Sequence, residues 1–248
     1  MGPTLGTPRG RSRGMDRVVI TLGIETATQV VSVALGGDDG VIGLVEIMQG
    51  RRHAEVLAPA IEFVCRQAGV AISQIGAVGV DIGPGLFTGM RVGIATAKTM
   101  AQALDVPLVG ISSLDLLAFP LRHTSKVIAS LIDARKGEVF YAFYLPSPGG
   151  VQRVSEPIAC SIEDFNADVM ARGQNVLAVG DGAHRYNDQL DASIEVADLA
   201  HPSAAPLVHL ARARALRADV GQAGAANLDS VQPMYLRAPD AQINWTTR

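Results

Sequence analysis

Short apolar runs fill the beginning of the chain and predict strands. The runs Val18 to Glu25, Val30 to Leu35 and Val41 to Ile47 are rich in β-branched residues, and polar or glycine-containing turns separate them. Runs of this length, bounded by turn residues, are typical of β-strands, and short turns join antiparallel neighbours. We therefore expect an antiparallel meander of three strands.

The pattern then changes to a helical period. Apolar residues recur every three or four positions between 57 and 68, which predicts an amphipathic helix. A strand at 77–82, a helix at 88–104 and a strand at 107–111 follow. A meander followed by strand–helix–strand crossovers predicts an α/β fold, in which a mixed sheet carries helices on its faces.

The second half repeats this organisation in a weaker form. It again opens with a hairpin, and a later strand again ends in a glycine turn, Gly180-Asp181-Gly182. The expected elements are a hairpin, a helix, a strand, a helix and a final extended segment, at 127–144, 162–171, 176–179, 204–218 and 231–237. The partial repetition indicates two lobes.

A glycine-rich turn between the strand at 77–82 and the helix at 88–104 is the strongest candidate for a binding site. Glycine adopts positive φ at little cost, proline fixes one φ, and the amides at a helix N-terminus attract anions. A tight turn without a ligand is the alternative interpretation. The candidate residues for a seam that meets a nucleotide or another protein are Asp81, Gly83, Pro84, Gly85, Thr88 and Arg91.

The helix after this turn carries small residues at four-residue intervals, namely Gly89, Gly93, Ala97 and Ala101. Residues four apart form the ridges along which helices pack, so this row lets another element approach the helix backbone closely. The row either packs on the chain's own sheet or belongs to a helical bundle with another protein.

Composition and charge exclude several classes of function. The formal net charge of −3 includes three arginines within the first fourteen residues, so the rest of the chain is more acidic still. This balance argues against a broad nucleic-acid footprint, which needs clustered Lys and Arg. No apolar run reaches the roughly 18 residues that a membrane helix needs. Cys65 and Cys160 form no C-x-x-C pair, and we expect buried thiols and a cytoplasmic protein.

Several segments together resemble the TsaB family, also called YeaZ. The segments are Leu22 to Thr28, Gly83 to Gly93, Ala97-Lys98, Val109 to Leu114 and Ile132 to Phe140, with looser similarity at 179–182 and 235–237. The resemblance implies the two-lobed actin-like/Hsp70/sugar-kinase (ASKHA) fold, each lobe being a mixed β-sheet flanked by helices. The implied division is a disordered extension at 1–16, a first lobe at 17–121, a second, degenerate lobe at 122–238 and a flexible tail at 239–248.

The resemblance also implies a function. TsaB-like proteins bind and activate the paralogous subunit TsaD, which transfers a threonylcarbamoyl group to adenosine 37 of tRNA. The implied partners are a TsaD-like paralogue, a TsaE-like ATPase and, when the protein is alone, a second copy of the chain, while tRNA is contacted only indirectly. The implied partner interface lies on the first two helices, at Leu57, Ile61, Val64, Gly89, Gly93, Ala97 and Ala101.

Catalysis by this chain alone is not expected. Transferase subunits of the TsaD type hold a metal with two histidines four residues apart after the strand at 107–111, and Ser113 and Leu117 occupy those positions here. No two histidines of the chain have this spacing, so we expect no metal site. We expect no nucleotide to bind this chain autonomously, and ATP or ADP only at the interface of a complex. The alternative is an ATP-dependent kinase or hydrolase of the same fold that acts alone.

Overall fold

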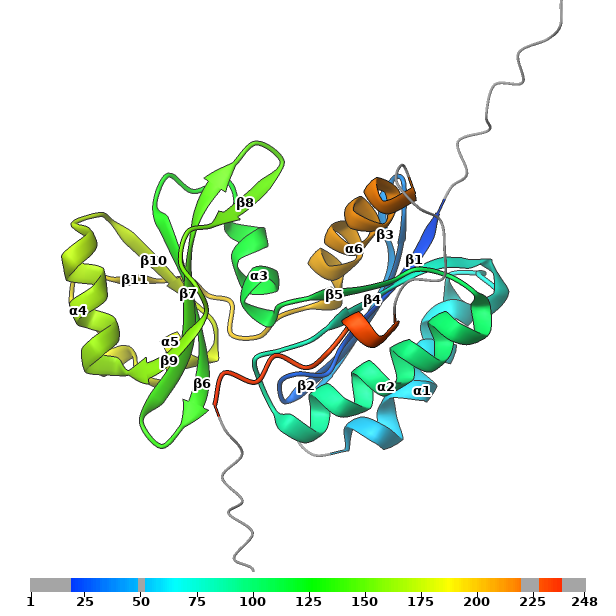
Figure 1. Cartoon of the computed structure of the whole chain (residues 1–248), viewed down its shortest axis with the longest axis horizontal. Coiled ribbons are helices and arrows are strands. Elements are labelled where there is room, and N and C mark those ends of the chain that lie inside the picture. The colour runs from blue at the N-terminus through cyan, green and yellow to red at the C-terminus, as the bar shows by residue number, and fades with distance from the viewer. Residues whose placement is uncertain (1–18, 49–51, 220–227, 238–248) are drawn as a thin grey trace, which may run out of the picture.

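The structure is a computed structural model that describes residues 19–48, 52–219 and 228–237. Its two sheets lie apart, each with its own helices, and segments of the chain cross between them (Figure 1). The predicted extension at 1–16, the flexible tail at 239–248 and Val18 at the start of the first predicted strand lie outside the described residues.

The first sheet contains five strands in the order β3-β2-β1-β4-β5. Their bounds are β1 Ile20–Glu25, β2 Val30–Gly37, β3 Gly40–Met48, β4 Ile75–Asp81 and β5 Leu108–Ile111. β2 is antiparallel to both β1 and β3, whereas β4 is parallel to both β1 and β5. The predicted meander and parallel crossovers are confirmed.

Two helices, α1 (His53–Gln67) and α2 (Phe87–Leu104), lie side by side on one face of this sheet (Figure 1). Their apolar residues bury against β1, β2 and β4 in a single core. Burial of apolar side chains is the main driving force here, at roughly 25 cal/mol per Å² removed from water. A 3₁₀ turn at Ile72–Gln74 leads from α1 into β4.

The second sheet has six strands, with β11-β10-β6-β7-β8 in order and β9 paired with β7. The strands are β6 Val127–Arg135, β7 Glu138–Ser147, β8 Gly150–Arg153, β9 Ile158–Ser161, β10 Val176–Val179 and β11 Glu195–Val196. The helices and 3₁₀ turns on the second-lobe side are α3 Ser113–Ala118, Phe119–Leu121, α4 Ile162–Arg172, α5 Asp181–Arg185 and Asn187–Gln189. Edge-to-face and stacked contacts among Tyr141, Phe143 and Phe165 form its core.

The short elements of this lobe differ from expectation. The sequence pattern predicts β6, β7, α4 and β10, but gives no signal for β8, β9 and β11, which have two to four residues each. Strands so short carry too few residues to establish a period of two. The predicted extended segment at 231–237 forms no strand.

The last helix, α6 (Ala204–Asp219), follows the second lobe in the chain but packs on the first. It contacts β1, β2, β4 and β5 on the face opposite α1 and α2 (Figure 1). Glycines of the sheet permit this approach, since a Cβ atom at Gly36 would lie 2.2 Å from a methyl group of Val208. The division into lobes at 17–121 and 122–238 is therefore wrong from residue 204 onward. It is also wrong for α3, which packs on β6 and β7.

A helix long and apolar enough to cross a membrane is absent from the described part of the chain.

Candidate functional site

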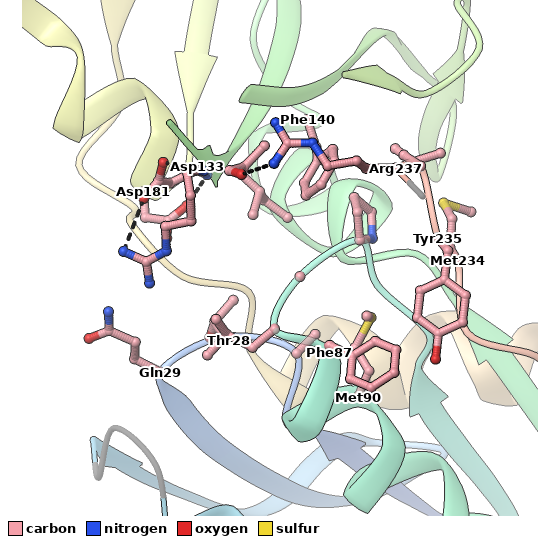
Figure 2. A pocket seen from close by; sticks show the side chains of 18 residues that line it. Thr28, Gln29, Phe87, Met90, Asp133, Phe140, Asp181, Met234, Tyr235 and Arg237 are labelled. Carbon is pink, nitrogen blue, oxygen red and sulfur yellow. Dashed lines mark hydrogen bonds and ion pairs between the residues drawn. The ribbon is translucent and has the colours of Figure 1, made fainter. Parts of the chain in front are cut away.

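A cavity of about 280 Å³ lies between the two lobes (Figure 2). The turn after β1 and the glycine turn before α2 form one wall, and the β6–β7 hairpin with the start of α5 forms the other. The last described segment of the chain, 234–237, lines the cavity as well. We call this cavity the interlobe cleft.

The glycine turn packs closely against the turn that follows β1. The Leu86 amide donates to the Ala27 carbonyl over 2.6 Å. A Cβ atom at Gly85 would lie 2.1 Å from that carbonyl oxygen, and one at Gly89 would lie 2.1 Å from the carbonyl oxygen of Thr26. The chain's own β1–β2 turn is therefore what these glycines allow the backbone to approach.

The predicted seam residues separate into three groups. Pro84 and Gly85 line the cleft. Asp81 and Gly83 are buried behind the cleft wall, and Thr88 and Arg91 are exposed on α2 outside it. Only the middle of the turn therefore faces the cleft, and a seam of all six residues with a nucleotide or another protein stays a prediction.

Two fully buried carboxyl groups support this wall. Glu25 Oε1 accepts from the amides of Ala27 (2.8 Å) and Thr28 (3.2 Å). Asp81 Oδ1 accepts from the Gly83 amide and from the Ser113 hydroxyl, both over 2.7 Å. Burial raises the pKa of both carboxyl groups, that of Asp81 to about 7, and the proximity of Asp81 raises the pKa of Glu25 further.

The opposite wall carries carboxylates that are already engaged. Asp133 Oδ1 accepts from the Tyr186 hydroxyl over 3.0 Å, and Asp133 Oδ2 pairs with Arg135 and Arg185 at 3.4 and 3.6 Å. Asp181 accepts from the Asp133 amide over 3.0 Å, and its burial raises its pKa. The side chains of the hairpin tip are thus held by one another.

The segment Leu228–Arg237, which we call the strap, joins the two lobes (Figure 2). Val231 packs in the first core, and the Met234 amide donates to the Ile82 carbonyl over 2.7 Å. At the far end, Arg237 pairs with Glu138 and donates to the Ala134 carbonyl over 3.1 Å. The strap therefore closes one side of the cleft.

All seven residues predicted to meet a partner are buried within the chain itself. Leu57, Ile61 and Val64 are at most 4% exposed, and Ala97 and Ala101 at most 1%. Gly89 and Gly93 are buried against Thr26. These residues form the intramolecular core, so the choice of interface residues is wrong, because spacing alone does not separate the inner face of a helix from its outer face.

The outer faces of the same helices are exposed. They include Ala58, Phe63, Ala95 and Thr99. Beside α1 lies a groove of about 570 Å³ lined mainly by apolar side chains of β3 and α1, with Glu55, Glu62 and Arg66 among its charged members.

The two positions that correspond to the metal-binding histidines of TsaD-type subunits do not hold a pair of metal ligands. Ser113 is fully buried and donates to Asp81, and Leu117 is fully buried in an apolar cluster. Across the described ranges, no three His, Cys, Asp or Glu residues are grouped so that they could hold a metal ion.

The groups that line the cleft are largely engaged within the chain itself. Its volume of about 280 Å³ is near the lower end of the range for small-molecule pockets, about 300–1,000 Å³. The Asp133 carboxylate is committed to two arginines and a tyrosine, and the strap takes up one side.

Some cleft residues were not among the predicted site residues. They include Thr28, Gln29, Phe87, Met90, Asp133, Asp181 and Met234 to Arg237 (Figure 2). A signal was available, because Thr28, Phe87, Met90 and Asp133 fall within the segments of stronger family resemblance. The looser similarity covers 179–182 and 235–237, which the structure brings to the two sides of the same cavity.

The fold and the cleft together define the class of protein to which the chain belongs. The fold is the two-lobed actin-like (ASKHA) fold, with an interlobe cleft whose charged groups are paired with one another. A family described as TsaD, tRNA N6-adenosine threonylcarbamoyltransferase, matches residues 41–245. The chain belongs to the TsaB branch of this family, also called YeaZ.

Relatives cover nearly the whole chain. The tRNA threonylcarbamoyladenosine biosynthesis protein TsaB of Haemophilus influenzae is 30% identical over 236 residues, covering 90% of this chain and 94% of the relative. TsaB of Bacillus subtilis is 26% identical over 230 residues, with coverages of 90% and 96%. A solved Pseudomonas aeruginosa protein described as similar to peptidase YeaZ superposes with a TM-score of 0.74 at 25% identity, covering 88% of this chain and 100% of that one.

Proposed function

We propose that this protein is the activating, non-catalytic subunit of a complex that transfers a threonylcarbamoyl group to adenosine 37 of tRNA. Its partner in this proposal is a TsaD-like paralogue. The names of the relatives, which are tRNA threonylcarbamoyladenosine biosynthesis proteins, support the pathway. Binding at a helical surface stabilises the active state of the partner, which is how one subunit activates another without touching its substrate.

The outer surface of α1 and α2 carries this proposal. The two helices lie side by side at the edge of the molecule (Figure 1), and residues of their outer faces are exposed. Phe63 is 46% exposed on α1, and the exposed residues Ala95 and Thr99 of α2 are small enough to admit a second helix closely. The apolar groove beside α1 extends this surface.

The absence of catalysis is supported by two parts of the molecule. The positions that correspond to the metal ligands are the buried Ser113 and Leu117, which a substrate cannot reach without unfolding of α3. The acidic side chains at the hairpin tip, Asp133 and Glu138, are both paired with arginines. The match to a transferase family therefore reflects common ancestry with the partner rather than a shared active site.

The remaining parts of the proposal concern the assembly. ATP or ADP binds where the subunits meet, a TsaE-like ATPase joins the pair, and tRNA contacts this chain only indirectly. Without its paralogue, the chain forms a homodimer through the same outer surface. Thr88 and Arg91 are exposed residues of the first turns of α2 outside the cleft, and they are the residues that we assign to the seam with the third protein.

The experiment is light scattering after size exclusion, on the protein alone and mixed with the TsaD-like protein of the same organism. A discrete heterodimer that consumes any homodimer is expected. Ala95→Arg should abolish the heterodimer without lowering Tm. Ala167→Arg, also an exposed helical alanine but on α4, should leave the heterodimer intact.

Separate peaks of the two wild-type proteins, with and without ATP, would contradict the proposal. Turnover of ATP by the chain alone would favour the alternative, a kinase or hydrolase acting by itself. Threonylcarbamoylation of tRNA by the partner, measured with and without this chain, completes the test. It should be lost with Ala95→Arg and retained with Ala167→Arg.

A further inference from the structure

Glu25 and Asp81 occupy neighbouring positions at the ends of two adjacent strands. β1 and β4 are parallel, and their register pairs Ile24 with Val80, one residue before each acid. Adjacent strands lie about 4.8 Å apart, and paired residues of parallel strands point to the same face of the sheet. The two carboxyl groups therefore project side by side.

Their common face can be assigned from the neighbouring strands. Glu25 is paired with Ser32, whose hydroxyl accepts from the Ala204 amide at the start of α6. Asp81 is paired with Ile111, which packs against Leu207 of α6. Both acids thus lie on the α6 side of the sheet, and both are 0% exposed.

Each acid has one oxygen satisfied and one without a partner. The amides of Ala27 and Thr28 donate to Glu25 Oε1. The Gly83 amide and the Ser113 hydroxyl donate to Asp81 Oδ1. Glu25 Oε2 and Asp81 Oδ2 are buried and have no hydrogen-bond partner in the described protein. A buried carboxylate oxygen without a donor is costly, and two adjacent ones repel each other in a medium of low dielectric constant.

We propose that Glu25 and Asp81 share one proton, held between Glu25 Oε2 and Asp81 Oδ2. One carboxyl group then donates to the other carboxylate, and both unpartnered oxygens are satisfied. The proton also fixes the cleft wall, because the same side chains hold the amides of Ala27, Thr28 and Gly83 at the two turns.

The surrounding charges agree with a protonated pair. Glu46 of β3 faces Glu25, and Asp115 of α3 faces Asp81, so both neighbours add negative charge. Arg214 of α6 and Arg153 of β8 are paired with Asp115. The first turn of α6 contains no acidic residue. Two histidines lie on adjoining segments: His53 of α1 contacts the Thr28 carbonyl, and the charge of His201, before α6, acts on Asp181.

The shared proton makes the stability of the folded chain depend on pH in a definite direction. Burial raises both pKa values above those of the unfolded chain, and the charge of Asp81 raises that of Glu25 further, so the folded state holds a proton that the unfolded state releases. Stability contributed by the pair is complete below about pH 4 and is lost as the pH rises toward 7. Each proton held only by the folded state changes the folding equilibrium constant roughly tenfold per pH unit.

The test measures the free energy of unfolding by urea between pH 5 and 8 for the wild type, Glu25→Gln and Asp81→Asn. Each amide keeps an acceptor for the loop amides and supplies a permanent N–H toward the other acid. As the pH rises, we expect the folding equilibrium constant of each variant to increase relative to that of the wild type. This ratio should grow roughly tenfold per pH unit until the wild-type pair ionises. Glu163→Gln, an exposed acid of the second lobe, should show no such trend.

A difference between wild type and both amide variants that is the same at every pH would overturn the proposal, because it would show a purely structural role. Saturable stabilisation of the wild type by Mg²⁺ or Na⁺ that both variants lose would also overturn it. Infrared spectroscopy of the folded wild type near pH 6 provides a second test. A protonated carboxyl stretch is expected, and its absence would contradict a shared proton even if a variant failed to fold.

Discussion

Tyr235 stacks on Phe87, with ring centroids 5.4 Å apart and planes inclined by 28°. The Arg91 guanidinium lies over the Phe87 ring, 4.0 Å from the centroid, and its Nε donates to the Tyr235 hydroxyl over 3.2 Å. The strap is thereby attached to the first turns of α2. Since Arg237 attaches the other end of the strap to the second lobe, α2 and the second lobe are physically connected.

Tyr235→Ala should release the strap while the fold persists. An aromatic pair contributes about 0.5–1.5 kcal/mol beyond its buried area, and both rings are nearly half exposed. Hydrogen exchange should therefore quicken at the Met234 amide, which is bonded to Ile82, with little change in the core strands. Met170→Ala, an exposed side chain on α4, serves as the control. Unchanged protection at Met234 would show that the stacking does not hold the strap.

Ser32→Ala should destabilise the packing of α6 on the first sheet. The buried Ser32 hydroxyl accepts from the Ala204 amide over 2.9 Å and donates to Glu46 over 3.1 Å, so its removal leaves a helix-terminal N–H without an acceptor. We expect a loss of about 1–2 kcal/mol in the free energy of unfolding by urea. The exposed Ser193→Ala should change it by less than about 0.5 kcal/mol. Equal effects of the two variants would contradict the assignment of Ser32 as the cap.

Cys160 should react slowly with thiol reagents in the folded protein. Burial, followed by the charges of Asp164 and Asp168, raises the pKa of its thiol to about 11. At pH 8 roughly one thiol in a thousand is then ionised, compared with about a quarter in an unfolded chain. Alkylation followed by peptide mass spectrometry should be more than about 100-fold slower in the folded state, and about tenfold faster at pH 9 than at pH 8. Asp164→Asn should accelerate it, whereas comparable folded and unfolded rates would contradict the assigned environment.

The first lobe was largely predictable because its elements are long and continuous in sequence. β1, β2 and α1 each bring their own periodic pattern, and consecutive elements are neighbours in space. The position of α6 was not predictable in this way. The spacing of its apolar residues indicates one apolar face. It does not indicate that this face packs on the first sheet, some eighty residues of second lobe later.

The candidate site was less predictable than the fold. Glycines indicate that the backbone approaches another group closely, but not which group. The structure shows that this group is the chain's own turn at Thr26 and Ala27. The cleft further depends on Asp181 and the strap, which no local pattern connects to the glycine turn. The pair Glu25 and Asp81 becomes meaningful only once the register of β1 and β4 is known.

Gly93 and Ala95 provide a matched pair that separates the inner and outer faces of α2. A Cβ atom at Gly93 would lie 2.2 Å from Thr26 Oγ1, and that hydroxyl donates to the Gly89 carbonyl over 2.8 Å. Gly93→Leu must therefore displace the β1–β2 turn, and overpacking of this kind typically costs about 1–3 kcal/mol. Ala95→Leu adds a similar volume on the exposed side and should change stability by less than about 0.5 kcal/mol. Thermal unfolding of the two variants, together with light scattering in the presence of the paralogue, should show an unstable Gly93→Leu protein and a stable Ala95→Leu protein with altered pairing. If the Gly93→Leu variant is instead stable, unfolds cooperatively and no longer binds the paralogue, the row of small residues belongs to the partner interface.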